Sequence, residues 1–147
     1  MSPPPSLKPN DASAALILPE DGGYLLQLRD DKPDIWYPGH WGCFGGASEP
    51  GENPAEALCR ELWEELGIHI QPPRWFTRFV FDLRGLGSVL CARDYFIVEL
   101  SRAQLAACRL GEGADFRAFP AETALNLKLV PYDSFAIFLH AQQDRIR

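Results

Sequence analysis

The most informative stretch of the sequence is Gly45–Ile68, which reads GGASEPGENPAEALCRELWEELGI. Its middle predicts an α-helix from about Pro54 to Leu66. Asn53 is a favourable N-cap residue, and a proline suits the first helical position because its missing N–H would have no partner there. Gly67 predicts the end of the helix, since glycine readily adopts the left-handed conformation that closes helices.

The predicted helix has an apolar side next to an acidic side. Because an α-helix turns about 100° per residue, the side chains of Glu61, Glu64 and Glu65 fall within an arc of roughly 100°. The adjoining arc holds Ala55, Leu58, Cys59, Leu62 and Leu66. We expect this apolar arc to pack against the core and the three carboxylates to lie beside it.

Three carboxylates with this spacing repel one another and would destabilise an isolated helix. A hard divalent cation relieves the repulsion, and Mg²⁺ prefers oxygen ligands while keeping positions for water and phosphate oxygens. Three glutamates alone are more often a solvated acidic face. The residues that surround Glu61, Glu64 and Glu65 favour a metal site instead.

The whole stretch resembles the Nudix box, G-x5-E-x7-R-E-U-x-E-E-x-G-U, in which U is aliphatic. Every fixed position is present, at Gly46, Glu52, Arg60, Glu61, Leu62, Glu64, Glu65, Gly67 and Ile68. At average residue usage, the probability of a chance match in a chain of this length is about 10⁻⁷. The resemblance covers most of the chain from about Ala12. It implies a Nudix hydrolase with an α/β/α sandwich fold, in which helices flank a mixed β-sheet.

The resemblance also implies roles for the acidic residues. Glu64 and Glu65 correspond to the principal metal ligands, assisted by the backbone carbonyl of Gly45. Glu61 corresponds to a residue that is a metal ligand in some members and a proposed general base in others.

Arg60 and Glu52 belong to the supporting part of the same motif. Arg60 lies four residues before Glu64, so the two side chains share a helix face. We expect Arg60 to bridge these carboxylates and to hold the helix against the loop before it.

Glu112 lies outside the box, in the glycine-rich segment Gly111–Gly113. In several Nudix proteins a glutamate in a similar Glu-Gly segment completes the metal site or acts as the base, and Asp115 is a weaker substitute. The candidate metal ligands are therefore Gly45, Glu61, Glu64, Glu65 and Glu112. The candidate catalytic residues are Arg60, Glu61, Glu64, Glu65 and Glu112. Whether Glu61 or Glu112 is the base, and how many cations bind, stays open.

The remaining sequence predicts strands interspersed with helices, hence a mixed sheet with helices packed on it. The predicted strands cover residues 12–19, 24–29, 41–44, 74–83, 88–100 and 116–119, and the third ends at the pair Gly45–Gly46. A short helix is predicted over 101–108 because Ser101 and Gln104 form a capping box. A closing helix from about Asp133 is predicted to bury Phe135, Phe138 and Leu139.

Aromatic and basic residues outside the motif have two interpretations each. Trp36, Tyr37 and Trp41 could stack on a nucleobase, but such rings more often pack in the protein. Arg78 and Arg93 could reach phosphates, but pairing with acidic neighbours is commoner.

The composition bounds the class of protein. The 147 residues fit a single domain, which we assign to residues 12–147 after a disordered, proline-rich lead-in over residues 1–11. A net charge of −6 argues against a nucleic-acid partner, and no apolar run is long enough to span a membrane. The four cysteines lack zinc-binding spacing and are expected to be reduced, which favours the cytoplasm.

The predicted function is a Mg²⁺-dependent pyrophosphohydrolase, for which Mn²⁺ can substitute. Its substrate would be a nucleoside diphosphate linked to another group: a nucleoside triphosphate, a nucleotide sugar or a dinucleotide. Two alternatives are a non-catalytic Nudix-like nucleotide-binding or regulatory module and a non-hydrolytic Nudix enzyme such as an isoprenoid diphosphate isomerase. Both are disfavoured because all the box carboxylates are present. A homodimer is left open, since many relatives dimerise.

Overall fold

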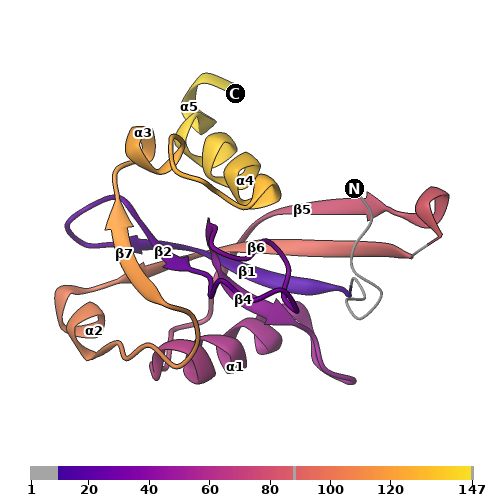
Figure 1. Ribbon diagram of the computed structural model, residues 1–147. Helices are drawn as coiled ribbons and strands as arrows, with labels where there is room; N and C mark the ends of the chain where they lie inside the picture. Colours follow the sequence, from indigo (N-terminus) through magenta and orange to yellow (C-terminus); the bar gives the residue numbers. More distant parts are fainter. Residues whose placement is uncertain (1–9, 88, 147) are drawn as a thin grey trace.

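The chain folds around a seven-stranded β-sheet with helices on both faces (Figure 1). The computed structural model describes residues 10–87 and 89–146. The strands are β1 (Ala12–Pro19), β2 (Tyr24–Leu28), β3 (Trp41–Gly42), β4 (Phe44–Ala47), β5 (Arg74–Asp82), β6 (Leu90–Leu100) and β7 (Asp115–Phe119). The helices are α1 (Pro54–Leu66), the 3₁₀ turn η1 (Arg84–Leu86), α2 (Arg102–Ala107), α3 (Ala121–Ala124), α4 (Pro131–Ala141) and α5 (Gln143–Ile146).

The sheet is mixed, as the sequence predicts. Its central order is β3-β2-β1-β6-β5, while β4 pairs with β1 and β7 pairs with β2. β1 and β6 are parallel along their length, and the other pairs are antiparallel. α1 and α2 cover one face and α3, α4 and α5 the other, which confirms the α/β/α sandwich (Figure 1). No helix within the described residues has the length and apolar character needed to cross a bilayer.

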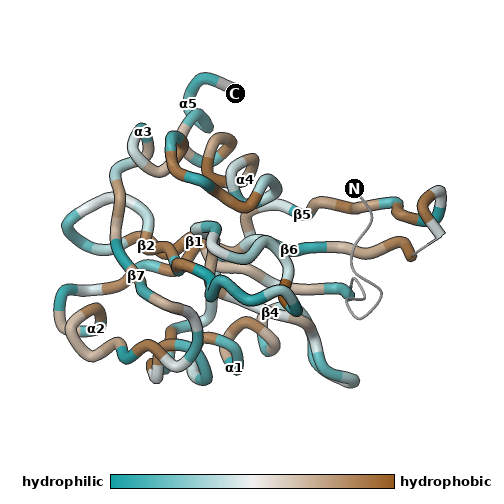
Figure 2. The backbone as a smooth tube through the Cα atoms, in the orientation of Figure 1, coloured by the Kyte–Doolittle hydropathy of each residue, from teal (hydrophilic) through white to brown (hydrophobic). Residues whose placement is uncertain are grey.

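Two hydrophobic cores lie on either side of the sheet because alternate residues of β1 point to opposite faces. Ala15 and Ile17 pack in the core beneath α1, together with Phe44. Ala14 and Leu16 pack in the core beneath α4. In Figure 2 the hydrophobic segments gather in α4 and the central strands, whereas the loop between β4 and α1 is hydrophilic.

α1 has the predicted bounds, and its ends have the predicted caps. Asn53 Oδ1 accepts a hydrogen bond from the Glu56 N–H at 2.8 Å, and Glu56 Oε1 accepts one from the Asn53 N–H at 3.1 Å. Gly67 closes the helix in the left-handed conformation, with φ 67°. The buried residues are Ala57, Leu58, Leu62, Glu65 and Leu66, so one of the three aligned carboxylates lies in the protein interior.

The predicted strand over 41–44 is divided at Cys43 and does not end at the glycine pair. Gly45 and Gly46 lie inside β4, opposite Ala14 and Ser13 of β1. Gly45 has φ 147°, and a Cβ there would collide with the Ser13 carbonyl. Glycine therefore lets β4 approach β1 closely enough to pair.

The closing helix begins at Pro131, and the prediction of its buried face is wrong. Phe135 is 64% exposed and Phe138 is 48% exposed, whereas Asp133, Ala136 and Ile137 are buried. Both sets have helical spacing, so periodicity alone does not decide between them. The smaller residues let the helix pack closely on the sheet, and hydrogen bonds compensate the burial of Asp133.

The predicted disordered lead-in over residues 1–11 falls mostly on residues 1–9, which lie outside the described residues. Asp11 differs from that expectation, because its Oδ1 accepts a hydrogen bond from the Ala92 N–H at 2.8 Å. The Asp11 carbonyl also accepts one from the Ser48 N–H at 3.1 Å. The ordered fold therefore includes Asp11.

Candidate active site

Arg60 on α1 donates hydrogen bonds to three carboxylates and one backbone carbonyl, and its Nε also lies 3.6 Å from Glu49 Oε2. Its Nε and Nη2 donate to the two carboxylate oxygens of Glu52, at 2.8 and 3.0 Å. Its Nη1 donates to Glu61 Oε1 at 3.0 Å and to Glu64 Oε2 at 3.2 Å. Nη2 also donates to the Ala47 carbonyl at 3.0 Å. The planar guanidinium thus bridges the carboxylates and joins α1 to the preceding loop, which are the contacts predicted from the sequence.

Glu52 ties this loop together. Its Oε1 accepts a hydrogen bond from the Glu49 N–H at 2.8 Å. The hydrogen bonds from Arg60 hold the pKa of Glu52 below its ordinary value. Both oxygens of Glu52 are therefore engaged in holding Arg60 and the loop.

Glu65 is the buried member of the acidic group, with 4% of its surface exposed. Its Oε2 accepts a hydrogen bond from the Gly45 N–H at 3.1 Å, so this carboxylate meets the backbone of β4. Burial, the largest cause, and the negative charges of Glu61 and Glu112 together raise the pKa of Glu65 to about 8, against the lowering effects of the Gly45 hydrogen bond and of Arg29. A carboxyl in this setting favours a proton or a cation beside it.

Glu61 lies against the glycine pair of β4. Burial raises the pKa of Glu61, and the hydrogen bond from Arg60 lowers it. A Cβ on Gly46 would lie 2.5 Å from the carboxyl carbon of Glu61 and within 2.7 Å of both of its oxygens. Gly46 is therefore required here because any side chain would displace this carboxylate.

Glu112 is brought to the acidic group by contacts between its loop and the end of α1. The Gly111 N–H donates to the Glu65 carbonyl at 2.7 Å, and a Cβ on Gly111 would collide with the Glu64 carbonyl. Gln27 Nε2 donates to the Glu112 carbonyl at 2.9 Å. The negative charge of Glu112 acts on Glu65, which places the two carboxylates in one electrostatic neighbourhood.

The predicted metal ligands thus lie around β4 and the second half of α1, with different exposures. Glu61 is 15% exposed and Glu64 is 51% exposed at the side chain. Among residues 10–87 and 89–146, no three Asp, Glu, His or Cys side chains are grouped so that they could hold a metal ion by themselves. Mg²⁺ seldom needs such a group, since it keeps several waters and binds one or two carboxylates plus substrate phosphates. An all-oxygen donor set under mutual repulsion fits such a cation.

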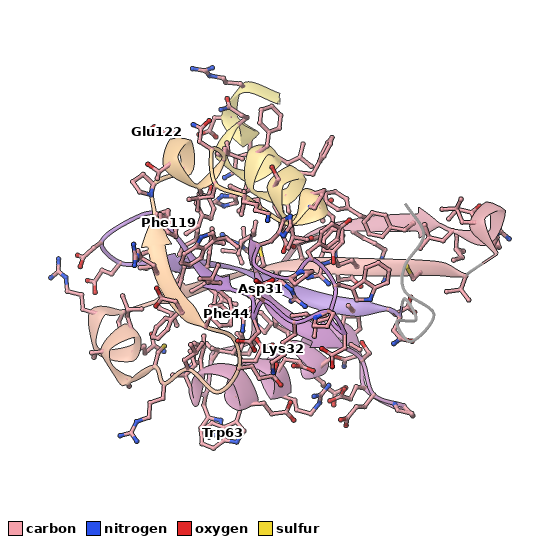
Figure 3. All side chains as sticks on the ribbon, in the orientation of Figure 1. Asp31, Lys32, Phe44, Trp63, Phe119 and Glu122 are labelled. Carbon is pink, nitrogen blue, oxygen red and sulfur yellow. The ribbon has the colours of Figure 1, made fainter. Side chains whose placement is uncertain are left out.

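A cleft of about 380 Å³ adjoins the acidic group and carries basic residues. It is lined by Gln27, Arg29, Asp30, Lys32, Ile35, Gly111, Glu112 and Gly113. Arg29 Nε donates to the Trp36 carbonyl at 2.7 Å, which fixes this side chain on the loop between β2 and β3. Lys32, labelled in Figure 3, lies on the same loop. The cleft combines the carboxylates of Asp30 and Glu112 with the basic side chains of Arg29 and Lys32, and Lys32 Nζ lies 3.7 Å from Asp30 Oδ2. The two basic groups suit phosphate oxygens.

The aromatic residues before the box are partly engaged in packing. The Tyr37 ring lies 5.9 Å from the Tyr132 ring of α4 in an edge-on arrangement. Trp41 packs edge-on against Phe119 at 4.9 Å. Packing accounts for both rings, whereas Trp36 makes only a tilted contact with Tyr37 at 6.4 Å among the ring pairs of the described residues.

Sequence reasoning missed the cleft residues Gln27, Arg29 and Lys32. One indication was present, because Gln27 is a polar residue in the otherwise apolar strand β2, where it is buried. The basic residues gave no comparable indication, since a loop that contains Arg and Lys is ordinary. The expected pairing of Arg78 and Arg93 with acidic residues is confirmed, since Arg78 Nε lies 2.9 Å from Asp94 Oδ1 and Arg93 Nη2 lies 3.5 Å from Asp133 Oδ1, but both carboxylates are buried and not on the surface.

Comparison with known proteins gives partial and full-length similarities. The chain is 48% identical over 51 residues to the nucleoside triphosphatase NudI of Escherichia coli O1:K1 / APEC. That match covers 35% of this chain and 36% of the relative, about a third of its length.

Two solved structures resemble the whole chain. The solution structure of the E. coli ORF135 protein has a TM-score of 0.72 and 27% identity, and covers 97% of this chain and 96% of its own. The crystal structure of the MutT protein from Methanosarcina mazei Go1 has a TM-score of 0.74 and 24% identity, and covers 95% of this chain and 98% of its own. The second similarity bears on the fold alone.

The family model for the NUDIX domain matches residues 8–138, which is most of the chain. The matched region includes the acidic group, Arg60 and the loop of Glu112. The chain therefore belongs to the NUDIX domain family, the family of the Nudix hydrolases.

Proposed function

We propose that this protein is a Mg²⁺-dependent pyrophosphohydrolase that cleaves a diphosphate bond in a nucleoside diphosphate linked to another group. Mn²⁺ can take the place of Mg²⁺. The observation that carries the proposal is the gathering of Glu61, Glu65 and Glu112: burial, the largest cause, together with the negative charges of Glu61 and Glu112 raises the pKa of Glu65 to about 8. Bringing these carboxylates together destabilises the folded protein. A function that requires a bound cation explains this grouping, because the cation would relieve the repulsion.

The cation would be held by Glu64 and Glu65, assisted by Glu112 and the carbonyl of Gly45. When bound, Mg²⁺ supplies charge neutralisation at the phosphate oxygens and orients the reacting groups. Arg60 keeps Glu61 and Glu64 in place through its fixed fork of donors. The Gly45 N–H orients the Glu65 carboxylate in the same way.

The protein must also accept a proton from the attacking water. Glu61 and Glu112 are the two candidates. Arg60 Nη1 donates a hydrogen bond to Glu61 Oε1 at 3.0 Å, which holds the Glu61 carboxylate in one position. Glu112 lines the cleft together with Arg29 and Lys32. We assign Glu112 to the metal group and leave Glu61 as the acceptor of the proton.

The basic residues of the cleft support a substrate with a phosphate chain. Arg29 and Lys32 line the same cleft as Glu112, so phosphates that lie there meet positive charge beside the metal group. The partial similarity to a nucleoside triphosphatase supports nucleoside triphosphates as the first class to test. Nucleotide sugars and dinucleotides are the next classes to test. We place the reaction in the cytoplasm, because all four cysteines are free thiols.

A panel of substrates with Mg²⁺ tests the proposal. Nucleoside triphosphates, a nucleotide sugar and a dinucleoside polyphosphate would be incubated with the protein, and the products identified by ³¹P NMR. We expect one class to yield a nucleoside monophosphate together with pyrophosphate or a second phosphate ester. If no member of the panel is cleaved but nucleotides bind in calorimetry, the protein is a binding module and the proposal is wrong.

A further inference from the structure

A second charged cluster lies on the face of the sheet opposite the acidic site. Asp133, in the first turn of α4, is 2% exposed. Its Oδ1 accepts a hydrogen bond from the Tyr95 hydroxyl at 2.7 Å and lies 3.5 Å from Arg93 Nη2. Its Oδ2 accepts a hydrogen bond from the Cys43 N–H at 2.9 Å. The carboxylate thus connects α4, β6 and the junction between β3 and β4.

Arg93 compensates the buried charge and is itself sheltered. Its side chain is 16% exposed, and its Nε donates to the Tyr95 hydroxyl at 3.1 Å. Its guanidinium lies 4.7 Å from the centre of the Tyr132 ring. None of these residues lines the cleft beside Glu112. The cluster is therefore separate from that cleft.

The contact with Cys43 occurs where the sheet is interrupted. Cys43 stands between β3 and β4, and a buried N–H there needs an acceptor that the ladder does not provide. Asp133 Oδ2 is that acceptor. A Cβ on Gly42 would lie 2.8 Å from the same oxygen, so glycine at this position allows the carboxylate to approach.

The same short segment reaches the acidic site two residues later. The Gly45 N–H donates to Glu65 Oε2 at 3.1 Å, from the opposite face of the sheet. Cys43 packs in the core beneath α4, and the next residue, Phe44, packs in the core beneath α1. The backbone from Cys43 to Gly45 is therefore fixed from both sides, by Asp133 and by Glu65.

We propose that Asp133 is a positioning residue for the acidic site: by fixing the backbone at Cys43 it sets the place of Gly45, against which Glu65 is oriented. This inference rests on the proposed function. Groups that hold a metal ligand in place commonly change metal affinity by about 10- to 100-fold when removed. Asp133 acts less directly: it fixes the backbone at Cys43, and that backbone places the Gly45 N–H that orients Glu65.

Two substitutions at position 133 and one control separate positioning from general stability. Asp133→Ala leaves the Cys43 N–H without its acceptor. Asp133→Asn can keep that hydrogen bond through its amide oxygen, while its NH₂ group faces the Tyr95 hydroxyl, which can accept. Tyr95→Phe is the matched control, because it removes a buried hydrogen bond of Asp133 and leaves the contact with Cys43 in place.

Mn²⁺ affinity, measured by EPR without substrate, is the main readout, together with the unfolding temperature in EDTA, kcat and KM. We expect Asp133→Ala to weaken Mn²⁺ binding by about tenfold or more and to lower kcat. Asp133→Asn should restore most of the affinity. Tyr95→Phe should lower the unfolding temperature and keep Mn²⁺ affinity close to that of the wild type.

Three results would overturn the inference. The first is a folded Asp133→Ala variant with wild-type Mn²⁺ affinity, including a variant altered only in KM, which would indicate substrate contact instead. The second is an equal loss of affinity in Tyr95→Phe, which would indicate general destabilisation. If Asp133→Ala does not fold, Gly42→Ala replaces it as the test variant, because the added Cβ pushes the Asp133 carboxylate away from the Cys43 N–H. Gly42→Ala should weaken Mn²⁺ binding in the same way, and wild-type Mn²⁺ affinity in this variant would overturn the inference. The third is a wild type that binds no Mn²⁺, which would overturn the proposed function itself.

Discussion

Replacing Glu65 by glutamine should stabilise the metal-free protein at neutral pH. Burial and the neighbouring carboxylates raise the pKa of Glu65 from 4.5 to about 8, so the native state holds this proton more tightly than the unfolded chain does. Because the folded pKa is the higher one, the native state loses stability as pH rises from about 4.5 to about 8, by at most about 1.4 kcal/mol per unit. Below about pH 4.5 the carboxyl is protonated in both states and the loss is absent.

The magnitude follows from the interval between the unfolded pKa and neutral pH. At pH 7 the unfolded chain ionises Glu65 while the native state largely keeps its proton, which lowers the free energy of unfolding by at most about 3 kcal/mol, and relaxation of the site reduces this value. A glutamine side chain does not ionise and can still accept the hydrogen bond from the Gly45 N–H. We therefore expect Glu65→Gln to exceed the wild type in unfolding free energy by about 1–3 kcal/mol at pH 7 in EDTA. Near pH 4.5 the advantage should vanish.

Urea unfolding followed by circular dichroism, in EDTA at both pH values, measures this difference. Glu99→Gln is the matched control, since it removes the charge of an exposed glutamate on β6 and should change stability by no more than about 0.5 kcal/mol. Mg²⁺ at about 100 times its Kd should add about 2.7 kcal/mol to the wild type and less to Glu65→Gln. The reasoning would be refuted if Glu65→Gln were less stable than the wild type in EDTA by the same amount at both pH values.

Two further predictions concern the support and the completion of the metal group. Arg60→Lys keeps the charge but cannot reproduce the contacts with Glu52, Glu61 and Glu64, so the Mg²⁺ concentration for half-maximal rate should rise by about tenfold or more while unfolding stays cooperative. An unchanged Mg²⁺ titration would limit Arg60 to surface pairing. Glu112→Gln should raise the same half-maximal concentration, and saturating Mg²⁺ should restore most of the rate if Glu112 is a ligand. A kcat that stays low at saturating Mg²⁺ would instead make Glu112 the proton acceptor, and wild-type behaviour would remove it from the site.

The features that were predictable from sequence depend on local interactions. The bounds of α1 follow from Asn53 at its start and Gly67 at its end, and the structure has both caps. The contacts of Arg60 with Glu64 and Glu52 follow from helical spacing and from the motif. In each case the partners lie within one helix and the loop before it.

The features that were not predictable depend on segments far apart in the sequence. Helical geometry places Glu65 beside the apolar arc, but its buried carboxylate accepts a hydrogen bond from the Gly45 N–H of β4, in a strand that only the tertiary fold brings to α1. The cleft requires Arg29 and Lys32 to meet Glu112, more than 80 positions along the chain from the first of them in the printed sequence. No local pattern reports such a meeting.

The closing helix shows a different limit. Phe135 and Phe138 have the hydrophobicity and spacing of a buried face, yet they are exposed, and the polar Asp133 is buried. The choice depends on Tyr95 and the Cys43 N–H, which supply the hydrogen bonds that Asp133 needs. A hydrophobic pattern does not predict these hydrogen bonds, because by pattern alone a carboxylate is assigned to the solvent-facing side of a helix.

The proposed function depends on a cation held by the carboxylates of α1, and the Mg²⁺ dependence of diphosphate cleavage tests this most directly. The rate of pyrophosphate or phosphate release would be measured for the wild type, Glu64→Gln and Glu65→Gln, across a Mg²⁺ titration and in EDTA. We predict saturable activity with Mg²⁺ and none in EDTA. Each substitution should lower kcat by about 100-fold or more, a barrier increase of about 2.7 kcal/mol. Full turnover of the wild type in EDTA, or near-wild-type rates for both variants in Mg²⁺, would contradict the account.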